Sequence, residues 1–127
     1  MQLVLVLAVA VHVLSSVFWA GSTFVLARNV GAGAGKLFRP QMGAATVTVL
    51  AGVYLWSQLH TGGFGRNEQI LALGAVSAIV AAGVQGALVG RALRKGADEA
   101  ATAPAHRISA GLLALALVCM TTARHLA

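Results

Sequence analysis

Charged residues are scarce in this sequence, and acidic residues are scarcest of all. Only 9% of its 127 residues are charged: nine are Lys or Arg and three are acidic. A soluble domain of ordinary composition carries about 25% charged residues, so this chain has too little polar surface to cover a water-soluble particle. The hydrophobic residues, 58% of the total, fall in long blocks, which is typical of a membrane protein.

The chain also lacks residue groups that several functions require. Its one cysteine, Cys119, lies in an apolar run, which excludes a disulfide within the chain and a CxxC motif. No acidic residue lies inside an apolar span, since Glu68 only begins the third, and this argues against a proton-driven transporter built on carboxylates. No Ser-His-Asp or two-carboxylate group indicates hydrolysis. No basic stripe carries interleaved aromatics, so we expect no nucleic-acid partner.

Four apolar blocks predict the fold. Each is close to the ~20 residues that cross the hydrocarbon of a bilayer, and none alternates with period two, so helices are expected. The first block lacks the basic region of a cleaved signal peptide and is predicted to be a retained span. We therefore predict an all-α protein with a single transmembrane domain, a four-helix bundle. The predicted spans are about 2–27, 41–60, 68–93 and 106–125, with Pro40 in the first turn of the second.

Basic residues between the spans predict the orientation. Seven of the nine fall in the first and third connections or at their edges, and the positive-inside rule places these connections in the cytoplasm. The prediction is N-out and C-out, in the inner membrane of a bacterium. The cytoplasmic set is Arg28, Lys36, Arg39, Arg91, Arg94, Lys95 and Arg107, whereas Arg66 and Arg124 lie outside.

Glycine is plentiful, and two glycine-rich segments have structural interpretations. Residues 31–36, GAGAGK, lack the first glycine and the final Ser or Thr of a phosphate loop, so a flexible linker is expected. Small residues at every fourth position of the third span favour close helix packing inside the same bundle or, as the alternative, in a homodimer. This small-residue stripe comprises Gly74, Ala78, Ala82, Gly86 and Gly90. The neighbouring Gln85 needs a polar partner at membrane depth.

Histidines are the candidates for chemistry. His12 lies deep in the first span, where an ionisable side chain is costly and is a functional candidate by default. Helical spacing puts Ser15, Ser16, Trp19 and Thr23 on the same side of that helix. His60 and His125 end the second and fourth spans on the outer side, and Trp56 precedes His60 by one turn. His106 lies near the opposite face.

Two cofactors suit paired histidines in a four-helix bundle. Haem b takes imidazoles from two helices, which predicts His12 as one axial ligand and His60 or His125 as the other. Trp19, Trp56 and Tyr54 would line the slot, and Arg124 or Arg66 would pair with the propionates. Copper accepts imidazole and thioether, which predicts a site from His60, Met120 and His125. Without a ligand, His12 is expected to bond Ser16 or a neighbouring helix.

The stretch from His12 to Gly21, with Trp19 two residues before the glycine, resembles the first helix of the CopD-like and HemJ-like small membrane proteins. Residues 43–56 and 120–126 are similar to the small four-helix members of that group. The HemJ resemblance implies haem b and oxidation of protoporphyrinogen. The CopD resemblance implies copper handling at the inner membrane.

Three hypotheses follow for the function. The first is a haem b-binding membrane protein in electron transfer or oxidoreduction, linked to a quinone, a porphyrinogen or another redox membrane protein. The second is a copper-binding or copper-transport protein. The third is an accessory subunit that stabilises a larger membrane complex.

Overall fold

The computed structural model describes residues 2–59 and 65–123 of the chain. Within these residues the chain forms four long helices and no strand, which confirms the predicted all-α class. The helices are α1 (Gln2–Arg28), α2 (Ala34–Leu59), α3 (Arg66–Val84) and α5 (Ala103–Thr122). Three short helical segments join α3 to α5: a π-helical turn η1 (Gln85–Val89), α4 (Gly90–Arg94) and a 3-10 turn η2 (Glu99–Thr102).

Three of these helical stretches are long and apolar enough to cross a membrane. They are Gln2–Arg28, Glu68–Arg94 and Glu99–Thr122. Large apolar side chains on them point outward, as a lipid-facing surface requires; Leu14, for example, is 71% exposed. Helix α2 is less apolar because Lys36, Arg39 and Gln41 lie in its first turns, and its crossing, like the N-out orientation, remains a prediction.

The boundaries of α2 differ from the predicted span. The helix begins at Ala34 instead of residue 41, so Pro40 lies inside it and not in its first turn. A proline there removes one helical hydrogen bond, to the carbonyl of Lys36. The residues before Pro40 still form helix because Glu99, from η2, accepts two amides at the start of α2. These are Gly33 N–H, just before the helix, at 3.1 Å and Gly35 N–H, within it, at 2.7 Å.

This contact also changes the interpretation of the glycine-rich segment. It is not a free linker, because it lies against the 3-10 turn. Gly31 (φ 78°) and Gly33 (φ 95°) have left-handed backbone angles that favour glycine, and a Cβ on Gly31 would collide with the carbonyl of Glu99. At this end of the bundle the connection 29–33 therefore packs on η2, the 3-10 turn that precedes α5. We call this end of the bundle the basic end.

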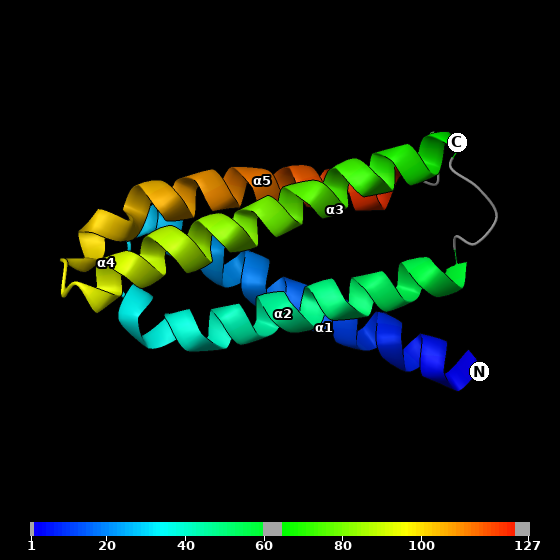
Figure 1. Cartoon of the computed structure of the whole chain (residues 1–127), viewed down its shortest axis with the longest axis horizontal. Helices are drawn as coiled ribbons and strands as arrows, with labels where there is room; N and C mark the ends of the chain where they lie inside the picture. Colours follow the sequence, from blue (N-terminus) through cyan, green and yellow to red (C-terminus); the bar gives the residue numbers. More distant parts are fainter. Residues whose placement is uncertain (1, 60–64, 124–127) are drawn as a thin grey trace.

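The helices form an incomplete ring. Helix α1 packs on α2 and α5, and α3 packs along α5, whereas α2 and α3 touch little. Figure 1 shows α3 and α5 side by side, with the first half of α1 diverging from them toward the N-terminus. The helices thus close tightly near the basic end and separate toward the opposite end, at which α1 begins.

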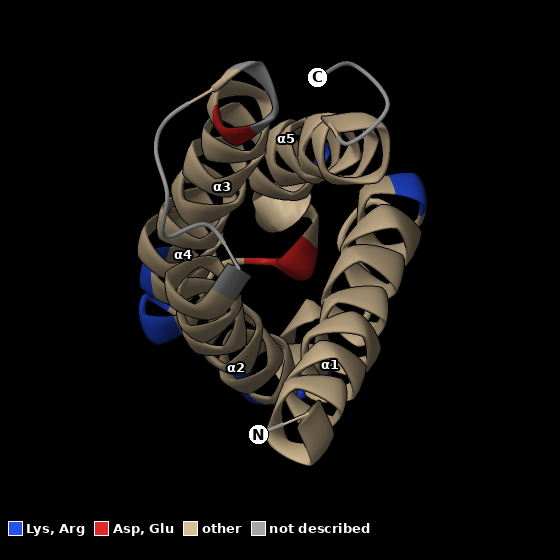
Figure 2. Ribbon diagram, turned by 90° about the vertical axis from the view of Figure 1, so that its right-hand side faces the viewer, with Lys and Arg blue, Asp and Glu red and all other residues tan. Residues whose placement is uncertain are grey.

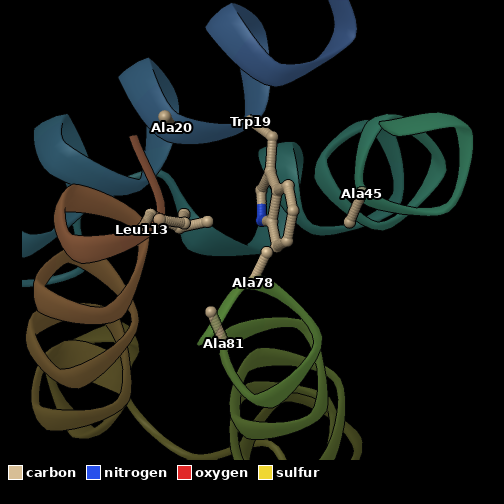
Figure 3. Close-up of a cluster of buried hydrophobic side chains, with 7 residues drawn as sticks. Trp19, Ala20, Ala45, Ala78, Ala81 and Leu113 are labelled. Atoms are coloured by element: carbon tan, nitrogen blue, oxygen red, sulfur yellow. The ribbon is translucent and has the colours of Figure 1, made fainter. Parts of the chain in front are cut away.

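A single tryptophan surrounded by small residues fills the centre. Trp19 is 1% exposed and projects between the helices, as Figure 3 shows. Alanines let four helices approach this ring closely. The buried cluster around it comprises Ala20, Ala45, Ala78, Ala81, Leu113 and Ala116.

The small-residue stripe of the third span serves packing inside the chain. A Cβ on Gly74 would lie 3.0 Å from the Cβ of Cys119 and 3.2 Å from the carbonyl of Ala116, both in α5. At the basic end, a Cβ on Gly90 would lie 3.1 Å from the ring of Phe38 in α2. The bundle itself uses both ends of the stripe, as the sequence favours; the homodimer remains a prediction.

Candidate ligand pocket

A mainly apolar pocket of about 580 Å³ occupies the region where the helices separate. It lies between α1, α2 and α3, with one side chain from α5, because α2 and α3 touch little there. Its polar groups are few and include the imidazole of His12. Apolar lining residues include Val49, Val53, Leu55, Leu71, Val76 and Ile79.

The ring of His12 is fixed by the backbone of α2. Its Nδ1 lies 2.9 Å from the carbonyl oxygen of Thr48. A carbonyl only accepts hydrogen bonds, so Nδ1 carries the proton and donates it. In a neutral imidazole, Nε2 then keeps its lone pair. This is the tautomer and the backbone contact that a metal-ligating histidine commonly has.

A glycine makes this approach possible. Gly52 lies one turn after Thr48, and a Cβ on it would be 3.1 Å from Cε1 of His12. Such a distance is tighter than ordinary van der Waals contact, so a side chain at position 52 would push the imidazole away from the α2 backbone. Thr48 itself is buried, and its hydroxyl oxygen lies 2.8 Å from both the Ser15 hydroxyl and the Ala44 carbonyl, to one of which it donates its single proton. Thr48 therefore contacts α1 at two residues, His12 through its carbonyl and Ser15 through its hydroxyl.

Trp56 and Met120 line the same pocket as His12. The pocket thus brings together an imidazole from α1, an indole from α2 and a thioether from α5. Cys119 is buried instead in the contact of α5 with Gly74. Of the residues predicted to bind a cofactor, three line this pocket in the described part of the chain: His12, Trp56 and Met120.

Ser16 and Trp19 lie elsewhere. The hydroxyl of Ser16 bonds the carbonyl of Val13 at 2.9 Å, within its own helix, so the partner of His12 is the neighbouring helix and not Ser16. Trp19 belongs to the buried cluster and does not line the pocket. Its Nε1 donates to Oε1 of Gln85 at 2.6 Å.

A buried polar network surrounds that contact. Gln85, the first residue of the π-helical turn, is 1% exposed and donates to Thr23 at 2.9 Å. Gln41 of α2 reaches the hydroxyls of Ser22 and Thr23. The network joins polar side chains of α1, α2 and η1 by direct hydrogen bonds. It separates the pocket from the basic end.

Three predicted residues, His60, Arg124 and His125, lie outside the described residues. His106 lies near the basic end, as expected, with Nδ1 3.0 Å from the carbonyl of Thr102. Its Nε2 is buried without a partner among the described atoms. The described residues contain no group of three or more His, Cys, Asp or Glu side chains arranged to hold a metal ion.

Comparison with known proteins adds no family. No family model, no curated protein and no solved structure matches this chain. The resemblance of the first helix to CopD-like and HemJ-like proteins therefore stays a prediction that rests on short motifs.

Sequence reasoning missed two features of the site. The contacts of Thr48 and Gly52 with His12 depend on the register of α1 against α2, which the sequence does not specify. A glycine one turn after a threonine within a span was only a weak indication of a close helix contact. The partner of Gln85 was required by its depth, but nothing in the sequence identified Trp19 as that partner.

Proposed function

We propose that the protein is a haem b-binding membrane protein that transfers electrons, with His12 as an axial ligand. The observation that carries the proposal is the state of His12. Its Nδ1 donates to the Thr48 carbonyl at 2.9 Å, which leaves Nε2 as a lone-pair donor on a ring that lines a large apolar pocket.

The pocket suits a large and mainly apolar group. Its volume of about 580 Å³ lies in the range of roughly 300–1,000 Å³ that is usual for cofactor and ligand sites. Aliphatic side chains and Trp56 would exclude water from a porphyrin face. When bound, the haem iron supplies one-electron redox chemistry, and its potential depends on the axial ligands and on the polarity around it.

The residues of this chain would set the properties of that group. The bond to the Thr48 carbonyl orients the imidazole and raises its basicity, which strengthens ligation. Met120 brings a thioether to the same pocket, and a histidine–methionine pair raises the reduction potential. Neither a donor nor an acceptor is specified, so a quinone and another redox membrane protein remain the proposed partners.

Copper is the second candidate, and one observation favours it. His12 and Met120 line one pocket, and imidazole with thioether is a ligand set that copper accepts. The volume of the pocket, far larger than a single ion needs, favours haem. An accessory subunit would show neither cofactor and would co-purify with a larger complex.

The test is the spectrum and metal content of the protein purified from a haem-producing host. We expect a Soret band that shifts on reduction with dithionite, and a haem content near one per chain. His12→Ala should lose most of the haem, whereas His106→Ala, a histidine outside the pocket, should keep it. A full haem complement with an unchanged spectrum in His12→Ala would refute the site, and copper without haem would favour the second candidate.

A further inference from the structure

A second cavity lies at the basic end, on the other side of the buried network. It has a volume of about 330 Å³ and is formed by the first turns of α2 and by the residues of α4. Its cationic lining residues are Lys36, Arg39 and Arg94, and Phe38 and Leu93 give it an apolar side. We call it the basic groove.

A glycine shapes the floor of the basic groove. Gly90 is buried, and a Cβ there would lie 3.1 Å from Cζ of Phe38 and 3.4 Å from Nη1 of Arg94. Arg94 is an exposed residue, and its guanidinium lies next to the α4 backbone at Gly90. This position brings it to the same cavity as the cations of α2.

The nearby carboxylates are engaged elsewhere. Glu99 accepts the amides of Gly33 and Gly35, and Asp98 accepts the amide of Ala100. Glu99 also attracts Lys36 electrostatically. Within the described residues, Arg39 and Arg94 have no carboxylate partner. A groove with two uncompensated guanidinium groups favours an anion.

We infer that the basic groove binds the headgroup of an anionic phospholipid. Arginine pairs with phosphate oxygens in a bidentate manner, and basic sites between helices on one side of a membrane bind anionic headgroups. Phe38 and Leu93 would contact the glycerol and upper acyl region, which a free phosphate lacks. In the end-on view of Figure 2, basic segments of α4 lie on the outer side of the ring of helices, where lipid would be, and an acidic segment lies inside it.

The inference goes beyond the proposed function and does not depend on it. The experiment is native mass spectrometry of the whole protein in a neutral detergent, titrated with phosphatidylglycerol, phosphatidylcholine or inorganic phosphate. We expect phosphatidylglycerol to bind at least about tenfold more tightly than phosphatidylcholine, because each basic residue near an anionic lipid contributes roughly a fivefold gain.

Two double variants distinguish lipid binding in the basic groove from general electrostatic attraction to the basic end. Arg39→Gln with Arg94→Gln should weaken phosphatidylglycerol binding by roughly 10- to 30-fold. Arg28→Gln with Arg107→Gln removes the same charge from exposed positions near the same end, outside the groove, and should change binding by less than about threefold. Gly90→Val should also weaken binding, because it fills the floor without changing charge.

Three results would overturn the inference. Equal losses in the two double variants would show general attraction to the basic end. Equal affinity for phosphatidylcholine would remove the role of the anion, and inorganic phosphate that competes as well as the lipid would show a phosphate site instead. Haem content is measured in each variant, so failure of the lipid site and failure of the haem proposal give different results.

Discussion

Replacement of Gln85 by leucine tests the buried network that closes the bundle below the pocket. The Gln85 side chain is 1% exposed, accepts from Trp19 Nε1 at 2.6 Å and donates to Thr23 at 2.9 Å. Leucine has similar volume but no acceptor, so the indole N–H would lose its hydrogen-bond partner at a buried position. An unsatisfied buried donor costs about 1–3 kcal/mol.

The membrane environment lowers the expected cost of losing these hydrogen bonds. Hydrogen bonds between transmembrane helices contribute about 0.6 kcal/mol on average and about 1.7 at most, because the unfolded chain in the membrane also finds partners. Gln85→Leu loses two bonds, so we expect the free energy of unfolding to fall by about 1–2 kcal/mol. The assay is unfolding by sodium dodecyl sulfate in mixed micelles, followed by far-ultraviolet circular dichroism.

A double-mutant cycle isolates the indole contact. Trp19→Phe removes the donor but keeps an aromatic ring, so Gln85→Leu should cost less in that background, by about 0.5–1 kcal/mol. If Gln85→Leu changes stability by less than about 0.3 kcal/mol, or costs the same with and without the indole, the network does not stabilise the bundle as argued.

Three further predictions address the pocket, the packing and the topology. Gly52→Val should displace His12 from the Thr48 carbonyl and weaken haem binding by about 10- to 100-fold in a haem titration; Gly43→Val, with nothing within 4 Å of its added Cβ, is the control, and equal affinities would contradict the role of Gly52. Gly74→Leu should destabilise the bundle by about 1–3 kcal/mol in the same detergent assay, because α5 lies against it; Gly83→Leu on the open side of α3 should be nearly neutral, and similar losses would show that the contact with Cys119 is unimportant. Ala97→Cys, after replacement of Cys119, should resist an impermeant thiol reagent in intact cells and react after permeabilisation, and labelling in intact cells would reverse the predicted orientation.

Much of the fold follows from hydropathy. The apolar blocks predict α1, α5 and the helical stretch from α3 through α4 within a few residues, because a long apolar segment in lipid has few alternatives to a helix. The start of α2 is different. Pro40 suggests a helix start, but Glu99, more than 60 residues away, supplies the acceptor for Gly33 and Gly35 and lets the helix begin earlier. A contact between distant connections leaves no local signal in the sequence.

The candidate site was predictable at His12 and less so elsewhere. An imidazole deep in a membrane span is a functional candidate because burying an ionisable side chain there costs free energy. The structure places His12 in the lining of a pocket with Trp56 and Met120. Trp19 follows the same helical spacing but turns into the core, because Gln85 offers its N–H an acceptor. Helical spacing predicts which residues share one side of a helix. Which residues of the neighbouring helices they contact depends on the register between the helices.

The most direct test of the central claim is rescue of a ligand-deficient variant by free imidazole. His12→Gly removes the ring and leaves space beside the Thr48 carbonyl. With haem supplied, this variant should lack the Soret band of a histidine-ligated haem, and imidazole in solution should restore it with saturable dependence on concentration. His106→Gly should retain the band without imidazole. A His12→Gly variant that binds haem with the wild-type spectrum in the absence of imidazole would contradict ligation by His12.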